Sequence, residues 1–210
     1  SRLEVYVLRN FMFRYEKMAY MKNLRLAIPL SFISMLFFPI ATWMFFYTQY
    51  LSFQQIATIL GVGAMVSLLA EIPTGVFADM VGRKWAITLS YFLFTVSMIG
   101  VAFSTTYMAF LIWGVVGSLV NSLYSGSMEA LLYDTLKERG EEETFDVWTS
   151  RMESVTWIGL FVSAVIGGYL YSVDPKFPYY AQAVMTFVAT ILAFALVEPR
   201  IDSTKYHLGD

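Results

Sequence analysis

The sequence predicts an all-α membrane protein with six transmembrane helices and with both termini in the cytoplasm. Three observations lead to this prediction. The composition is apolar, because 58% of the 210 residues are hydrophobic and only 14% are charged, whereas soluble domains are about half apolar and about a quarter charged. The charged residues cluster between long apolar runs. Lysine and arginine fall almost entirely in alternate loops, which orients the chain across a membrane.

Six apolar windows are long enough to cross the hydrocarbon core, which takes roughly 20 residues of helix. They are Ala27–Tyr47, Ile56–Val76, Trp85–Phe103, Tyr107–Tyr133, Val155–Ser172 and Tyr180–Val197. We therefore expect a six-helix bundle over 27–197, a cytoplasmic segment over 1–26, and a tail over 198–210 that could begin a linker to a second bundle. Residues 1–20 are either an upstream extension, because "MKNLRLAIPL" from Met21 reads like a bacterial start, or a basic segment on the membrane surface.

Basic residues mark the cytoplasmic side of a membrane protein. Before the first window the chain carries Arg2, Arg9, Arg14, Lys17, Lys22 and Arg25. The second-to-third connection, the fourth-to-fifth connection and the tail add Arg83, Lys84, Lys137, Arg139, Arg151, Arg200 and Lys205. The opposite connections contribute only Lys176. Both termini are therefore predicted to be cytoplasmic, in an integral protein of the bacterial inner membrane.

The sequence lacks residues and motifs on which several classes of function depend. The chain has no cysteine, so no disulfide or thiolate site can form, and its single histidine, His207, lies in the polar tail. The net charge of −2 does not suit a nucleic-acid partner. Neither H-E-x-x-H nor G-x-S-x-G occurs, which argues against an intramembrane protease or transferase. We predict no enzyme, no metal and no cofactor.

One polar stretch interrupts the apolar sequence between the second and third windows. Gly75 offers a place where a neighbouring helix can approach closely, and Gly82 allows an abrupt reversal of the backbone. Asp79 puts a carboxylate at the membrane edge, where it can pair with a cation or cap a facing helix. Arg83 and Lys84 anchor the connection on the cytoplasmic side. A plain basic loop with glycines would contain the same residue types.

The ordered spacing of this stretch, G-x-x-x-D-x-x-G-R-K, resembles the signature between helices two and three of the major facilitator superfamily (MFS) of secondary transporters. The resemblance extends from about Met21 onward and implies an MFS-type N-terminal bundle, one half of that fold. It also implies that Asp79 and Arg83 bind a carboxylate at the end of helix four and a helix of the second half, as a latch of the outward-facing state. Asp134 is the candidate partner of Arg83, and Glu129 is a second possibility.

The fifth window resembles a second MFS pattern, the helix-five antiporter motif G-x-x-x-G-P-x-x-G-G-x-L. The matching positions are Gly159, Gly167, Gly168 and Leu170, but Ser163 and Ala164 stand where Gly-Pro would be. The matching residues are small or apolar, so close helix packing explains them as well as gating does. The missing Gly-Pro argues against obligatory antiport.

Two carboxylates lie inside the apolar windows. Many proton-coupled members of the family carry an arginine midway along helix four, and the fourth window here has neither arginine nor lysine. Glu71 and Glu129 are then the candidates for proton coupling, because a charge within the membrane is costly and marks function by default. The structural alternative is that each glutamate pairs with Arg83, Lys84 or Arg151.

Polar and aromatic residues within the windows suggest a solute path. The candidates for a central cavity are Trp43, Tyr47, Asn121, Tyr124, Ser125 and Trp157. Asn121 and Ser125 are four residues apart and share a helix face. The alternative assigns the aromatics to the interfacial belt or to packing, and Asn121 to a hydrogen bond between helices. Pro39 and Pro73 are candidate bend points within the first two windows.

The leading hypothesis is a secondary active transporter that moves a small solute by alternating access, with proton coupling as an option and with efflux and uptake by a permease both open. The expected partners are the solute, the lipid bilayer and a second six-helix bundle, which is either a missing C-terminal half or a second copy. An aromatic, weakly polar cavity suits amphipathic drugs, while sugars and metabolites also bind between aromatics. The alternatives are a non-transporting membrane receptor or assembly protein of this fold, and a half-transporter that acts as a dimer.

Overall fold

The computed structural model describes residues 21–199, and within that range every regular element is helical. The predictions for residues 1–20 and for the tail from 200 onward lie outside the described residues. The elements are a helix at 21–35, η1 (Phe38–Ala41), α2 (Trp43–Tyr47), α3 (Phe53–Val81), α4 (Arg83–Phe103), α5 (Tyr107–Arg139), η2 (Glu142–Thr144), α6 (Phe145–Val173) and α7 (Phe177–Ala193).

Five described segments are long and apolar enough to cross a membrane. They are Met21–Ala41, Phe53–Val81, Arg83–Phe103, Tyr107–Arg139 and Glu142–Val173. The sixth predicted window corresponds to α7, an apolar helix of 17 residues that begins and ends earlier than the window Tyr180–Val197. The all-helical membrane class is therefore confirmed, while six crossings and the cytoplasmic position of both termini stay predictions.

Three helices run past their apolar windows into charged sequence. α3 continues five residues beyond its window, α5 continues six, and α6 starts ten residues before its window. The helices are longer than the apolar windows, because hydropathy marks only the part of a helix that suits hydrocarbon. α5 stops at Gly140, whose φ of 67° is left-handed and whose N–H donates to the carbonyl of Lys137. This is a glycine cap of the helix C-terminus.

The first span is broken within the window Ala27–Tyr47, next to the candidate bend point Pro39. The α-helix ends at residue 35, and after two non-helical residues the chain continues as the short 3₁₀ helix η1. Pro39 lies in the first turn of η1, and proline neither donates a backbone hydrogen bond nor fits the preceding α-helical turn. The N–H of Phe38 instead donates to Gln182 Oε1 at 3.1 Å. α3 passes through Pro73 as one helix.

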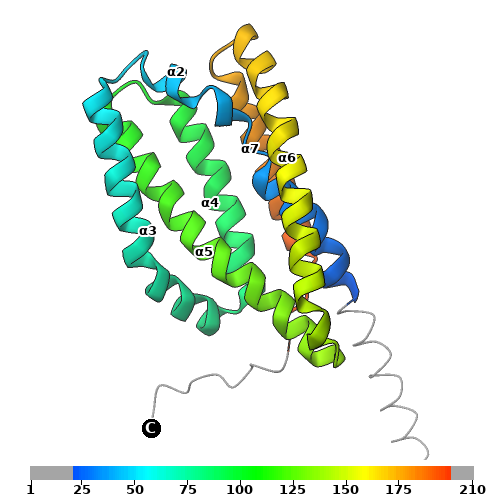
Figure 1. Cartoon of the computed structure of the whole chain (residues 1–210). Helices are drawn as coiled ribbons and strands as arrows, with labels where there is room; N and C mark the ends of the chain where they lie inside the picture. Colours follow the sequence, from blue (N-terminus) through cyan, green and yellow to red (C-terminus); the bar gives the residue numbers. More distant parts are fainter. Residues whose placement is uncertain (1–20, 200–210) are drawn as a thin grey trace, which may run out of the picture.

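The helices form a bundle with a buried apolar cluster toward each end. α5 packs against α3 and α4, α4 against α7, and α6 against η1. Figure 1 shows α3, α4 and α5 on one side and α6 and α7, with the first span, on the other. One cluster contains Leu30, Leu132 and Leu196. Another contains Phe46 and Phe110 and lies toward α2.

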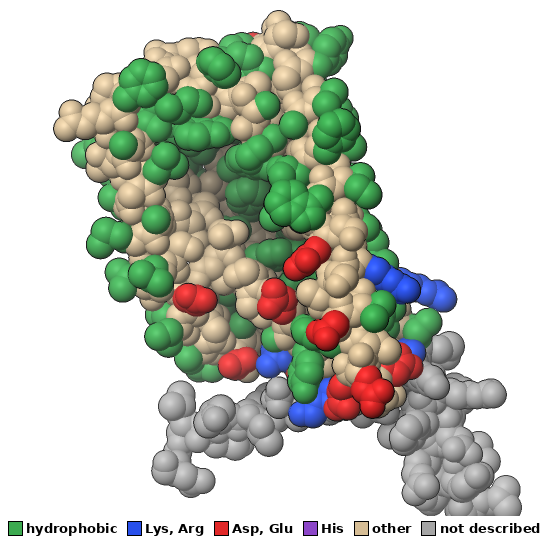
Figure 2. Space-filling model, in the orientation of Figure 1, with side chains coloured by type: hydrophobic (Ala, Val, Ile, Leu, Met, Phe, Trp, Pro, Cys, Tyr) green, Lys and Arg blue, Asp and Glu red, His purple; other side chains and the backbone are tan. Residues whose placement is uncertain are grey.

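Charged side chains gather at one end of the molecule. In Figure 2 acidic and basic residues occupy the lower end of the visible face, and hydrophobic side chains border a hollow above them. The lower end carries the α3–α4 joint and the α5–α6 connection, which the sequence assigns to the cytoplasm. Large apolar residues on α3 and α6, such as Ile72 and Phe161, are 79% and 72% exposed. Such surfaces suit lipid or a second bundle.

Candidate functional site

The joint between α3 and α4 consists of a single residue. Gly82 has a φ of 104°, a conformation that residues with a side chain rarely adopt, so a glycine allows α3 to end and α4 to begin within one step. A Cβ at Gly82 would also lie 3.1 Å from the carboxylate of Glu198. At Gly75, by contrast, a Cβ would meet no described atom within 4 Å. The close helix approach expected at Gly75 is therefore not found within residues 21–199 and stays a prediction for a second bundle.

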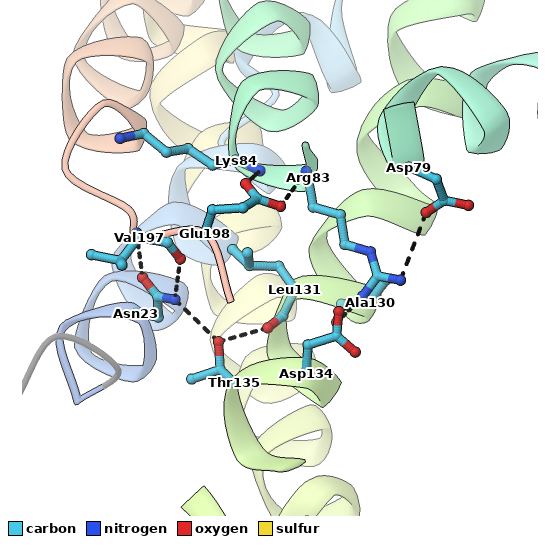
Figure 3. Close-up of polar contacts among 10 residues, drawn as sticks. All are labelled: Asn23, Asp79, Arg83, Lys84, Ala130, Leu131, Asp134, Thr135, Val197 and Glu198. Atoms are coloured by element: carbon cyan, nitrogen blue, oxygen red, sulfur yellow. Dashed lines mark hydrogen bonds and ion pairs between the residues drawn. The ribbon is translucent and has the colours of Figure 1, made fainter. Parts of the chain in front are cut away.

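Arg83 connects the joint to α5 (Figure 3). Its guanidinium forms an ion pair with Asp134, and its Nη1 donates to the carbonyl of Ala130 at 2.9 Å. Its Nη2 lies 3.7 Å from Oδ1 of Asp79, one helical turn back. The side chains of Asp134 and Arg83 are only 6% and 16% exposed, while that of Asp79 is 63% exposed. A carboxylate as buried as Asp134 needs a partner, so Arg83 holds α5 against the joint.

Glu198, which follows α7, caps the N-terminus of α4. Its Oε1 accepts the N–H of Arg83 at 2.7 Å and its Oε2 accepts the N–H of Lys84 at 2.8 Å (Figure 3). The first N–H groups of a helix lack intrahelical partners and favour a negative charge, so the carboxylate satisfies both needs. The sequence interpretation missed this residue. Glu198 could have been found from its position, because it is an acidic residue directly after the sixth window and lies on the same side of the membrane as the start of α4.

Asn23 was also missed, and it ties the first span to two other segments at the same end. Its Nδ2 donates to Thr135 Oγ1 at 3.1 Å and to the carbonyl of Val197 at 2.7 Å. Its Oδ1 accepts the N–H of Val197 at 2.8 Å. The side chain is buried, so these bonds fix the first span, α5 and the segment after α7 in one arrangement. Figure 3 shows these contacts beside those of Arg83.

The two glutamates predicted within the windows lie on the surface of the bundle. Glu71 on α3 and Glu129 on α5 are both exposed. Among the described residues neither forms an ion pair with Arg83, Lys84 or Arg151. Within residues 21–199 Arg83 pairs with Asp134 instead, and the ion-pair alternative stays a prediction. A role in proton coupling stays a prediction.

A pocket of about 400 Å³ lies in the half of the bundle away from the ionic contacts. Three of the predicted cavity residues line it: Trp43 and Tyr47 from α2, and Asn121 from α5. Gly63 and Gly114 also line it, and a Cβ at these positions would lie 2.7 Å from Ser118 and 3.0 Å from Ile59, so both glycines let α3 and α5 pack closely beside this space. A second cavity of about 80 Å³ is lined by Tyr124 and again by Asn121. Asn121 thus borders both spaces.

The other two predicted cavity residues do not line either cavity. Ser125 is exposed and its hydroxyl donates to the carbonyl of Ser122 at 3.5 Å. It follows Asn121 by just over one helical turn, which moves it along α5 beyond the larger pocket. Trp157 is 68% exposed on α6. A cavity role of Ser125 and Trp157 stays a prediction, because the lipid-facing and cavity-facing sides of a membrane helix have similar residue types.

The glycines of α6 differ in what they pack against. A Cβ at Gly159 would lie 2.9 Å from the carbonyl oxygen of Phe32, and one at Gly167 would overlap the carbonyl of Phe38. At Gly168 a Cβ would meet nothing described within 4 Å. Gly159 and Gly167 therefore let the broken first span lie directly against α6, which favours the packing interpretation at these two positions.

Comparison with known proteins agrees with this arrangement. The family model of the Major Facilitator Superfamily matches residues 26–208. The chain is 25% identical to YxaM of Bacillus subtilis strain 168, which is described as an uncharacterized MFS-type transporter. The alignment extends over 155 residues and covers 73% of this chain and 38% of YxaM. The chain is 21% identical over 124 residues to MJ1317 of Methanocaldococcus jannaschii, which has the same description, covering 58% of this chain and 30% of the relative. The aligned regions thus span less than half the length of either relative. The chain belongs to the major facilitator superfamily of membrane transporters.

Proposed function

We propose that this chain is the N-terminal six-helix half of a secondary transporter, which moves a small solute by alternating access together with a second six-helix bundle. The observation that carries the proposal is the ionic cluster of Asp79, Arg83 and Asp134, at the end of the bundle away from the aromatic pocket. Alternating access requires a state in which one end is held closed while a site near the middle opens to the other side.

In this proposal the ion pair of Arg83 and Asp134 holds the closed state of this end, and Asp79 adds a contact with the second bundle. Asp134 is almost fully buried, so its charge depends on Arg83. Asp79 is mostly exposed and meets Arg83 through one oxygen at 3.7 Å. Its carboxylate can therefore also accept from a donor on the second bundle, and a helix N-terminus is the most suitable one. Loss of that contact would open the cytoplasmic side.

Proton coupling would extend the same cycle. Glu71 and Glu129 are exposed on a bundle that a second bundle would partly cover. A carboxylate exposed in one state and covered in the other takes up a proton in the covered state, because burial penalises its charge. The direction of solute movement then follows the proton gradient for symport and opposes it for antiport.

The test is solute uptake by proteoliposomes that contain the natural full-length protein. A panel of labelled small solutes should include at least one with saturable uptake. Arg83→Ala should reduce that uptake at least tenfold, and Arg151→Ala should not, because Arg151 contacts the ring of Trp148 and lies outside the ionic cluster. Saturable uptake that Arg83→Ala leaves unchanged would remove the latch. No saturable uptake of any solute would favour the receptor or assembly alternative.

A further inference from the structure

Tyr179 brings a side chain from α7 into the aromatic pocket. α7 packs mainly against α4, yet Tyr179 in its first turn is only 2% exposed and lines the pocket together with residues of α2, α3 and α5. Its ring lies 4.7 Å from that of Phe46, so the position of the ring is fixed by packing. The sequence interpretation assigned no cavity residue to the sixth window.

The hydroxyl of Tyr179 is buried and has no hydrogen-bond partner within residues 21–199. A buried hydroxyl without a partner is costly, and natural proteins contain few of them. Other tyrosines of this bundle are satisfied: Tyr91 donates to the carbonyl of Leu30 at 2.9 Å, and Tyr171 accepts from Gln49 at 2.9 Å. Tyr179 is a lining residue of the pocket, so an unpaired hydroxyl on this side chain points to a partner that enters the pocket.

The rest of the wall indicates the chemistry of that partner. Trp43 and Tyr47 stand edge to face with ring centroids 5.7 Å apart, and Met98 adds a thioether. Asn121 supplies one side-chain amide. None of the described lining residues is Asp, Glu, Lys or Arg. An ion that left water for this wall would lose its hydration without gaining a counter-charge, whereas an aromatic ring would gain stacking contacts.

We infer that the Tyr179 hydroxyl binds a neutral aromatic solute that carries a hydroxyl or carbonyl group. The ring of the solute lies against Trp43, Tyr47 and Met98, and its polar group bonds to Tyr179, with Asn121 as a second polar contact. A volume of about 400 Å³ falls within the range of small-molecule sites. This inference rests on the proposed function, because it names the class of solute that the transporter would carry.

The test measures equilibrium binding to the purified natural full-length protein with radiolabelled probes. The probes share one ring system and differ in their polar group: 1-naphthol, naphthalene, 1-naphthoate and 1-naphthylmethylammonium. We expect saturable binding of 1-naphthol, and binding at least tenfold weaker for naphthalene and for both ions. Tyr179→Phe should weaken 1-naphthol about tenfold, the factor for one buried hydrogen bond, and leave naphthalene unchanged. Tyr180→Phe, the neighbouring tyrosine outside the pocket lining, should change neither.

Binding of 1-naphthol and naphthalene is compared between the wild type and Tyr179→Phe. This comparison isolates the contact between the hydroxyl of 1-naphthol and the hydroxyl of Tyr179. Tyr179→Phe removes an oxygen that makes no described hydrogen bond, so the fold should persist and elution on size exclusion should match the wild type. An equal loss of 1-naphthol and naphthalene binding, no loss at all, no saturable binding of 1-naphthol, or equal binding of 1-naphthoate would each overturn the inference. If 1-naphthol binds through Tyr179 but no solute is transported, the site stands and the proposed function fails. If a solute is transported but 1-naphthol binds independently of Tyr179, the proposed function stands and the inference fails.

Discussion

Replacement of Arg83 by alanine should shift the transporter away from its outward-facing state. The substitution removes the ion pair with Asp134, the 2.9 Å hydrogen bond to the carbonyl of Ala130 and the contact with Asp79. Asp134 then remains on α5 with its side chain 6% exposed and without the guanidinium. The state that holds this end closed loses its main ionic contact, so the state that opens this end becomes relatively more stable.

The size of the shift follows from the burial of the pair. Breaking a buried ion pair by removing one partner costs about 3–5 kcal/mol. Arg83 keeps some contact with solvent, and the inward-facing state can retain part of the pair, so we take about 1.5–3 kcal/mol as the difference between the two states. At about 1.4 kcal/mol for each factor of ten, the ratio of outward to inward states should fall roughly ten- to hundredfold.

The assay uses the absence of cysteine from these 210 residues. Ala64 is exposed toward the pocket from α3, so Ala64→Cys gives a thiol that reports access to the pocket. A membrane-impermeant maleimide is applied to the external face in spheroplasts and to the cytoplasmic face in inverted vesicles. The ratio of the two labelling rates measures the ratio of outward to inward states, and Arg83→Ala should lower it at least tenfold.

Two further variants make the result specific. Arg151→Ala removes a cation that lies 5.4 Å from the ring of Trp148, and it should leave the labelling ratio within about threefold of the parent, an ordinary surface effect. Arg83→Lys keeps the charge but loses the planar fork, so its ratio should fall between those of the parent and Arg83→Ala. An unchanged ratio in Arg83→Ala, with normal expression, would refute the latch.

Three other predictions concern the end cap, the α6 glycines and proton coupling. Glu198→Gln should lower the free energy of unfolding by about 1 kcal/mol, because it removes the charge that caps α4; an unchanged melting temperature in detergent would contradict the cap. Gly167→Ala should lower the melting temperature or yield more than Gly168→Ala, since only at the former does a methyl meet the first span; equal effects would remove this packing contact. Glu129→Gln should abolish the dependence of uptake on an imposed proton gradient if this carboxylate carries the proton; an unaltered dependence on the gradient would leave Glu129 without that role.

The features that the sequence predicted well are those set locally. The apolar windows located the long helices because membrane helices satisfy their backbone internally and need only a run of apolar residues. The motif at the α3–α4 joint predicted a reversal at Gly82, since only glycine suits a φ of 104° there. The same motif suggested Asp134 as the partner of Arg83, and the two side chains are in contact.

The features that the sequence missed depend on distant parts of the chain. Asn23 and Val197 are 174 residues apart, and Glu198 lies 115 residues from Arg83, so no local pattern connects them. Tyr179 reads as an ordinary apolar residue at the start of a helix, and only packing brings its ring to the pocket. The sequence also does not say what Trp157 faces, because an exposed aromatic residue on a membrane helix can face lipid, a partner or a cavity equally well.

The most direct test of alternating access is two-sided labelling of Ala64→Cys in the otherwise unaltered full-length protein. The thiol introduced at position 64 should react with the impermeant maleimide both from the external face and from the cytoplasmic face, because each of the two states exposes the pocket to one side of the membrane. Ser150→Cys, near the start of α6 at the charged end, serves as the control and should react only in inverted vesicles. Reaction of Ala64→Cys from both faces is the result that the account predicts. Reaction from one face only, with the control behaving as expected, would contradict it.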